Sequence, residues 1–319
     1  MQPHALHDVL APAKLNLFLH ITGRRHDGYH LLQSAFVAID WFDTLHFERR
    51  NDAVITRHDL GAALPEDDLI IRAARLLQQN SRTAYGADIS IQKNIPAQAG
   101  LGGGSSDAAT TLLALNHLWQ TRLTALQLHA LAQQLGADVP FFLHRGPAWV
   151  EGVGEQISDL ALPHTAFHTP IAVLKPEFGV STQQLFSSPV LTRNTKPVRM
   201  ADFASFDLCS KRFENESEIQ QHALLKTGAE NPYAVFDFGH NDLQQVAVAF
   251  QPQIGQALEY LSDLSGGPAR MTGSGSAVFA AMRKSVDPLE QSTNSLPFGW
   301  QFKMCKILDE HPHPDWLPD

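Results

Sequence analysis

The stretch PAQAGLGGGSSDAATTLLALNHLW, residues 96–119, decides the fold. It begins with a run of glycine and serine and continues with apolar side chains at helical spacing. Glycine has no Cβ, so such a turn lets backbone N–H groups close around an anion, and the following helix adds the positive end of its dipole. The stretch therefore predicts a phosphate-binding loop at a helix N-terminus, with Ser105, Ser106 and Asp107 as candidate caps. We expect the backbone to approach the phosphates at Gly103.

Two widespread phosphate-binding patterns do not describe this loop. A Walker-type loop needs lysine followed by serine or threonine after its last glycine, whereas Gly104 is followed by Ser105. A dinucleotide-binding fingerprint needs glycine where Ser105 stands and an acidic residue roughly 20 positions on, where the chain has Trp119 and Gln120. A flexible glycine linker is the remaining alternative, but a linker does not normally lead into an amphipathic helix.

The composition limits the class of protein. With 319 residues, 44% of them hydrophobic, the chain can bury one large or two medium cores. A formal net charge of −9 argues against a surface for nucleic acid. Cys209 and Cys305 lie far apart and read as reduced thiols. The sequence has no apolar stretch of membrane-spanning length and no signal-peptide pattern. We expect a soluble cytoplasmic protein without a membrane or nucleic-acid partner; the oligomeric state stays open.

Hydrophobic patterning predicts strands and helices in alternation, which is typical of an α+β protein. The predicted strands are residues 15–21, 31–40, 87–96 and 149–157, and the predicted helices are residues 67–80, 123–136 and 242–264. Asp27 and Gly28 between two apolar runs predict a hairpin, and Gly136 is a candidate helix C-cap. A proline-bearing segment at 160–170 marks a domain boundary, and the tail 311–319 is expected to be loosely ordered.

The loop with its flanks, PxxxGLGGGSSDAA, resembles the phosphate-binding motif of the GHMP kinases. APAKLNLFL at 11–19 is similar to the first motif of that family, and ARMTGSGSAVFA at 269–280 is similar to its third. The segment ending in GYHLLQS at 34, with LGADVPFFL at 135–143 and EGVGE at 151–155, resembles the branch that phosphorylates a cytidyl diphosphate ester of methylerythritol.

The resemblance implies a two-domain α+β kinase with its active site in the cleft between the domains. Residues 1–163 would form the N-terminal domain that binds ATP, and residues 164–319 the C-terminal domain on the substrate side. ATP would be the co-substrate and Mg²⁺ would be carried with the nucleotide, so we expect no metal ligands of the chain's own. The reaction would phosphorylate the 2-hydroxyl of this small-molecule substrate in the non-mevalonate isoprenoid pathway.

The candidate catalytic residues are Lys14 and Asp138. Lys14 and Asn16 have the same parity on a predicted strand, so their side chains share one face, which by spacing alone could equally be a solvated sheet face. Asp138 lies between a predicted helix end and an apolar segment expected to be a strand, where a turn residue is common. The resemblance makes Asp138 the general base and Lys14 the residue that holds it.

The resemblance also assigns the binding residues. The expected ATP-binding residues are Pro96, Ala97, Gln98, Ala99, Gly100, Leu101, Gly102, Gly103, Gly104, Ser105 and Ser106. The expected substrate-binding residues are Asn16, Tyr29, His30, Thr182, Phe186, Gly273 and Ser274. Among these, Tyr29 and Phe186 would stack on cytosine and His30 would read its edge.

One position departs from the family pattern: Asp68 stands where the family usually has asparagine. An ionised carboxylate only accepts hydrogen bonds, so it cannot replace an amide donor toward the nucleotide base. Two alternatives to this function remain open. The chain could be another GHMP kinase, such as a homoserine kinase, or a catalytically silent nucleotide-binding protein of the same fold. Tyr29, His30 and Phe186 argue against the first, and Lys14, Asp138 and the glycine loop argue against the second.

Overall fold

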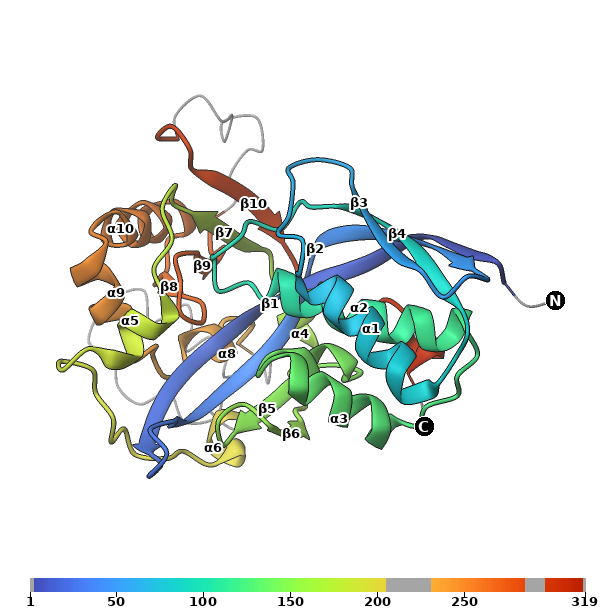
Figure 1. Ribbon diagram of the computed structural model, residues 1–319. Helices are drawn as coiled ribbons and strands as arrows, with labels where there is room; N and C mark the ends of the chain where they lie inside the picture. The colour runs from blue at the N-terminus through green and yellow to red at the C-terminus, as the bar shows by residue number, and fades with distance from the viewer. Residues whose placement is uncertain (1–2, 205–230, 285–295, 318–319) are drawn as a thin grey trace, which may run out of the picture.

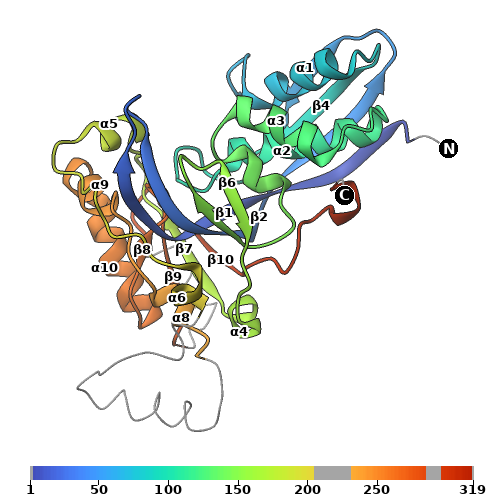
Figure 2. The same cartoon turned by 90° about the horizontal axis from the view of Figure 1, so that it is seen from below.

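The computed structural model describes residues 3–204, 231–284 and 296–317. A long antiparallel hairpin runs through the molecule, formed by β1 (Ala5–Arg24) and β2 (His30–Arg50) (Figures 1 and 2). The predicted Asp27–Gly28 turn joins them: Gly28 has a φ of +92°, and the Tyr29 N–H donates to the Asp27 carboxylate at 3.2 Å. The hairpin prediction is confirmed, although β1 and β2 are far longer than the strands predicted at 15–21 and 31–40.

The first sheet surrounds this hairpin. Its strands follow the order β3-β4-β2-β5-β6, with β1 also paired to β2. The added strands are β3 (Ile55–Asp59), β4 (Gly86–Gln92), β5 (Ala148–Glu151) and β6 (Gln156–Asp159). Three helices pack beside this sheet: α1 (Leu69–Ser81), α2 (Gly103–Leu118) and α3 (Ala125–Leu135) (Figure 1). Apolar residues of α2, such as Leu112 and Leu115, are fully buried against Ile89 of β4 and Leu45 of β2. This core fixes the start of α2 next to the end of β4.

The second sheet has the strand order β10-β7-β9-β8. Its strands are β7 (Ile171–Lys175), β8 (Arg270–Met271), β9 (Val278–Ala281) and β10 (Gln301–Cys305). Two helices, α9 (Gln244–Phe250) and α10 (Gln253–Ser265), lie against it, and they confirm the helices predicted near 242–264 (Figure 2). Short helices occupy the connections: α4 (His164–His168), α5 (Thr182–Ser187), α6 (Met200–Ala204) and α8 (Ala234–Asp237).

Two predicted strands are wrong in detail. Residues 149–157 form a hairpin, β5 to β6, because Gly152 and Gly154 adopt φ values of +73° and +114° and turn the chain. The segment after Asp138 is a 3₁₀ helix, η1 (Val139–Leu143), with Pro140 in its first turn. Pro140 has no N–H to donate to a sheet, so a strand is disfavoured there.

The helix of the glycine loop begins earlier than predicted. α2 starts at Gly103, with Gly102 as its N-cap at a φ of +72°, so Ser105, Ser106 and Asp107 lie inside the first turns. Asp107 cannot cap the helix because its carboxylate is buried and bound to Lys93 at 2.6 Å. The helices α1 and α3 confirm their predictions, and Gly136 ends α3 as expected.

The expectation of a loosely ordered tail is wrong for the part that is described. His311 is buried and its Nε2 lies 3.1 Å from the Phe142 carbonyl oxygen. Trp316, in the short helix η4 (Pro314–Trp316), stacks on His313 with ring centroids 4.4 Å apart and on His117 of α2 at 5.3 Å. These contacts are tertiary, so local composition carries no sign of them.

Some expectations are not decided by the fold. The second sheet begins at Ile171, shortly after the proline-bearing segment, and the division at 163/164 stays a prediction. Cys209 lies outside the described residues, whereas Cys305 is a buried free thiol. Within ranges 3–204, 231–284 and 296–317, no helix has the length and apolar character needed to span a bilayer.

Candidate active site

The glycine loop connects β4 to α2 and is held against the segment 272–277. Gly100 and Gly102 have φ values of +73° and +72°, which glycine adopts without strain. A Cβ on Gly100 would stand 2.2 Å from the Thr272 carbonyl oxygen, so the two loops touch through their backbones. The Ala277 N–H also donates to the Ala99 carbonyl at 3.0 Å. The third motif, residues 269–280, is therefore in contact with the glycine loop.

The backbone N–H groups in the first turn of α2 point toward the glycine loop. Ser106 is the first residue whose N–H bonds back along the chain, to the Gly102 carbonyl at 2.9 Å. The N–H groups before it have no intrahelical acceptor, and the positive end of the helix dipole lies at the same point. Gly103 has an ordinary helical φ, and a Cβ there would meet Ile95 at 3.0 Å. A Cβ on Gly104 would have only Leu69 within 4 Å, so the space beside Gly104 is more open, and the phosphate approach expected at Gly103 stays a prediction.

A buried ion cluster of Asp43, Lys93 and Asp107 lies next to the glycine loop, and the sequence patterns did not predict it. Lys93 contacts the carboxylates of Asp43 and Asp107, both of which are almost completely buried. Asp43 also accepts the N–H groups of Asn94 at 2.6 Å and Ile95 at 2.8 Å. Burial raises the pKa of Asp107 to about 8, although Lys93 opposes this. Burial disfavours the charge on Lys93 too, but Asp107 and Asp43 outweigh it and leave its pKa raised.

Lys14 and Asn16 lie on one face of β1, as their parity predicts, and both are buried. The Lys14 Nζ lies 2.5 Å from the Asn16 Oδ1 and 3.4 Å from the Asp138 Oδ2. The Asn16 amide donates to the Ser34 hydroxyl at 3.0 Å, which fixes its orientation. The Asp138 side chain keeps 36% of its surface exposed, at the start of η1. A buried ammonium thus points at a carboxylate that remains accessible to a ligand.

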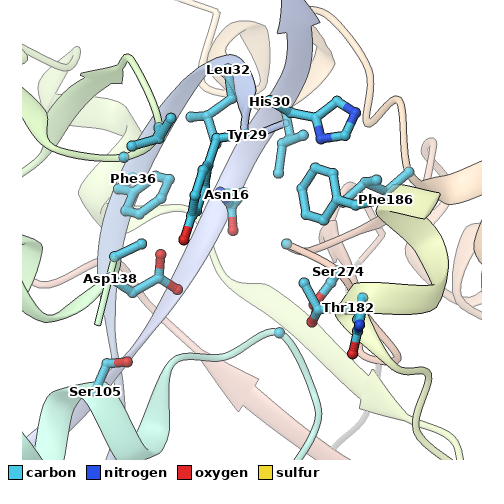
Figure 3. A pocket seen from close by; sticks show the side chains of 18 of the residues that line it. Asn16, Tyr29, His30, Leu32, Phe36, Ser105, Asp138, Thr182, Phe186 and Ser274 are labelled. Carbon is cyan, nitrogen blue, oxygen red and sulfur yellow. The ribbon is translucent and has the colours of Figure 1, made fainter. Parts of the chain in front are cut away.

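Aromatic side chains lie at the other end of the same cavity. The rings of His30 and Phe186 are 5.0 Å apart at an angle of 31°, and Tyr29 is 64% exposed on the other side of the opening (Figure 3). Thr182 and Ser274 join α5 to the third motif through their hydroxyls, 2.8 Å apart. Burial, followed by the charges of nearby Arg193 and Arg24, lowers the pKa of His30.

Two adjoining hollows contain nearly all the predicted site residues. The first, of about 730 Å³, is lined by the two predicted catalytic residues and by all the predicted substrate-binding residues: Lys14, Asp138, Asn16, Tyr29, His30, Thr182, Phe186, Gly273 and Ser274. The second, of about 750 Å³, is lined by residues 95–105 of the loop. Both hollows share Gly100, Ser105, Thr182 and Ser274. Ser106 lines neither hollow; its hydroxyl is buried without a hydrogen-bond partner in the described part of the chain.

Asp68, the departure from the family pattern, has a structural role. Its carboxylate accepts the Ile71 N–H at 3.1 Å as the N-cap of α1 and lies 2.8 Å from the Arg57 guanidinium. Both contacts use the same oxygen, Oδ1, and the residue borders the hollow of the glycine loop. An ionised Asp68 can therefore serve as cap and ion-pair partner without donating to a base.

Comparisons with known proteins find relatives of this chain. The model of the GHMP kinases N-terminal domain matches residues 68–146, and that of the GHMP kinases C-terminal domain matches residues 223–291. A protein of Polaromonas naphthalenivorans (strain CJ2), named 4-diphosphocytidyl-2-C-methyl-D-erythritol kinase, is 51% identical over 98% of this chain and 96% of its own length. A protein of Acidovorax ebreus (strain TPSY) with the same name is 49% identical over 98% of this chain and 99% of its own.

Solved structures extend the comparison. A crystal structure of 4-(cytidine 5'-diphospho)-2C-methyl-D-erythritol kinase matches with a TM-score of 0.65 and 32% identity, over 93% of this chain and 98% of that one. A homoserine kinase from Cytophaga hutchinsonii has a TM-score of 0.64 at 15% identity, over 98% and 97% of the two chains, and so shares the fold. Full-length identity near 50% and two matching domain models place the molecule: the chain belongs to the GHMP kinase family.

Proposed function

We propose that this chain transfers the γ-phosphoryl group of ATP to the 2-hydroxyl of 4-diphosphocytidyl-2-C-methyl-D-erythritol, a step of isoprenoid biosynthesis. The observation that carries the proposal is the continuity of the two hollows. The glycine loop lies at one end, the His30–Phe186 ring pair lies at the other, and the Lys14–Asp138 pair stands between them. Two relatives are about half identical to this chain over nearly their full length, and both are named as this kinase.

In the proposed mechanism Asp138 takes the proton of the attacking hydroxyl. The hydroxyl oxygen forms a bond to the γ-phosphorus, the bond from that phosphorus to the bridging oxygen breaks, and ADP leaves. Lys14 holds the Asp138 carboxylate at 3.4 Å and offsets negative charge as it develops on the transferred group. Positioning and electrostatics account for most of such a reaction, so the N–H groups at the start of α2 matter as much as the base.

Magnesium fits the donors that this site offers. Within the described residues no group of three or more His, Cys, Asp or Glu side chains could hold a metal. Mg²⁺ in phosphoryl-transfer sites is commonly bound through substrate phosphates and one or two protein oxygens. Ser105 presents such an oxygen toward the cavity (Figure 3). It would supplement the phosphate ligands of an ion carried with the nucleotide, which would neutralise phosphate charge.

Three further proposals accompany this function. Residues 1–163 and 164–319 would be its two domains, with ATP bound by the first. A cytoplasmic location is supported by the need for ATP and by relatives that are bacterial kinases. We propose a small molecule as the partner, with no nucleic acid, given the net charge of −9.

Replacing Tyr29 or Phe186 with alanine is expected to raise the KM for the cytidyl substrate and leave the KM for ATP near its original value. Stacking of a base on an aromatic ring contributes about 1–3 kcal/mol, which corresponds to roughly 5- to 150-fold in KM. The Tyr29 variant is the cleaner of the two, because Phe186 also contacts His30. Phe250→Ala, which removes an exposed ring on α9, is the matched control. Steady-state kinetics with each substrate varied in turn measure the effect, and an equal rise of both KM values would contradict it.

Gly104→Val tests the phosphate loop. The new Cβ would have only Leu69 within 4 Å, so we expect the fold to tolerate the change, and the methyl groups would extend into the hollow that Gly104 lines. We expect the free energy of ATP binding, measured by calorimetry, to become less favourable by about 1–3 kcal/mol, which is the usual cost of adding methyl groups to a closely packed site. Gly146→Val, whose Cβ would have only the Asp309 carbonyl oxygen within 4 Å, at 3.9 Å, and which lines neither hollow, is the control. Unchanged ATP binding in the Gly104 variant would remove the loop from the site.

A substrate panel tests the function as a whole. ADP formation is followed with ATP and, in separate reactions, the cytidyl ester, bare methylerythritol phosphate, homoserine and mevalonate. We expect turnover with the cytidyl ester far above that with the other three alcohols. Comparable turnover of the bare phosphate would show that the cytidyl group is not recognised, and the chain would then be a kinase of another small alcohol.

A further inference from the structure

Arg193 links the two aromatic side chains at the substrate end of the cavity. Its guanidinium donates to three carbonyl oxygens around the end of α5: Phe186 at 3.1 Å, Ser188 at 2.6 Å and Leu191 at 3.0 Å. Its Nε–H group donates to the Nε2 of His30 at 3.0 Å. One side chain therefore ties the segment that carries Phe186 to the start of β2, where His30 stands.

This contact determines where the imidazole proton lies. A guanidinium has only donors and is always protonated in proteins, so the Nε2 of His30 must accept and must carry a lone pair. In a neutral imidazole the proton is then on Nδ1, which leaves an N–H donor at the ring nitrogen that Arg193 does not occupy. Burial and the charges of Arg193 and Arg24 lower the pKa of His30 and so favour the neutral ring.

A ring fixed in this form discriminates between pyrimidines. At position 3 cytosine has an unprotonated nitrogen, which accepts a hydrogen bond, whereas uracil has an N–H group. An Nδ1–H donor can pair with the first and faces another donor in the second. We propose that Arg193 is a positioning residue that holds His30 in the Nδ1–H tautomer and thereby makes the site selective for cytosine over uracil; this inference rests on the proposed function.

The alternative is that Arg193 merely braces the end of α5. Three of its four contacts are to backbone carbonyls of that segment, so its loss would also loosen Phe186. A loosened ring stacks less well on any pyrimidine, because every base has a π-face. The two roles therefore differ in one quantity: bracing alone changes the KM for cytidyl and uridyl esters equally, whereas tautomer control changes their ratio.

The test compares Arg193→Met, which keeps the length of the side chain and removes its donors, with Arg193→Lys, which keeps a charged donor. Arg199→Met is the matched control, because Arg199 is 83% exposed and pairs with Asp202 outside the cavity. For each protein, kcat/KM is measured with the cytidyl ester and with the otherwise identical uridyl ester. We expect the cytidine-over-uridine ratio to fall by roughly tenfold in Arg193→Met, about the contribution of one hydrogen bond. Arg193→Lys should recover part of it, and Arg199→Met should match the wild type.

Nitrogen-15 NMR of the histidine rings reads the tautomer directly in the unliganded wild-type protein. The His30 signals are assigned by their absence from His30→Ala, and Nε2 is expected to resonate as an unprotonated nitrogen and Nδ1 as a protonated one. In Arg193→Met we expect protonation to shift toward Nε2. If Arg193→Met does not fold, the wild-type and Arg193→Lys spectra still decide the tautomer.

The outcomes separate the two proposals. Absence of turnover of the cytidyl ester by the wild type would overturn the proposed function itself. Turnover with a clear cytidine preference that Arg193→Met leaves unchanged would overturn the inference alone. A protonated Nε2 in the wild type would also overturn it, because Arg193 could not then be donating to that nitrogen.

Discussion

Asp138→Asn is expected to lower kcat by roughly two to four orders of magnitude, the usual contribution of a general base. An amide is nearly isosteric with the carboxylate but cannot take the proton of the attacking hydroxyl. Asp138 lies beside Lys14 at the start of η1, outside the glycine loop, so ATP affinity should stay close to that of the wild type. Single-turnover kinetics and calorimetry with ATP measure the two quantities separately.

The control for this variant is Asp159→Asn. Asp159 is a surface carboxylate, 96% exposed, on β6 and beside His144. The Asp159→Asn substitution makes the same chemical change away from both hollows and should leave kcat unchanged. If Asp138→Asn kept more than about half of the wild-type turnover, Asp138 would not be the base, since even a weak general base contributes about a hundredfold.

Lys14→Met is expected to lower kcat by about 10²–10³, in line with the loss of one preorganised charge or donor at a developing negative charge. Methionine fills the buried space of the lysine stem but leaves Asn16 and Asp138 without the ammonium that lies 2.5 Å and 3.4 Å from them. Because the interaction strengthens as charge develops, kcat should fall more than the substrate KM rises.

Circular dichroism melting accompanies that measurement, because Lys14 is buried and a folding defect would imitate a catalytic one. Lys303→Met on β10, where the lysine lies over the Trp41 ring at 5.5 Å, is the matched control. A folded Lys14→Met with near-normal kcat and a raised KM would show that Lys14 binds substrate without stabilising the transition state.

Local pattern was sufficient for some parts of this molecule. The period of two in β1 places Lys14 and Asn16 on one face, and the structure has both side chains there, in contact. The helix predicted after the glycines is present as α2, and the turn at Asp27–Gly28 forms the tip of the central hairpin. These features depend on residues that are close in sequence, so the sequence expresses them directly.

Other parts depend on contacts between distant residues. The ion cluster of Asp43, Lys93 and Asp107 is assembled from β2, the end of β4 and α2, and each residue alone resembles an ordinary surface charge. The packed tail depends on Trp316 meeting His117, about two hundred positions earlier in the sequence. The place of Phe186 came from the family resemblance, because no local pattern determines which ring faces Tyr29 across a cavity.

The central claim is that the cytidyl ester receives a phosphoryl group from ATP in this cavity. Phosphorus-31 NMR of a reaction containing the wild-type protein, ATP with Mg²⁺ and the cytidyl ester tests it most directly. The account predicts a new phosphomonoester signal, growing in step with ADP, while the diphosphate signals of the ester remain. Formation of ADP and inorganic phosphate without that signal, or equal phosphorylation of bare methylerythritol phosphate, would contradict it.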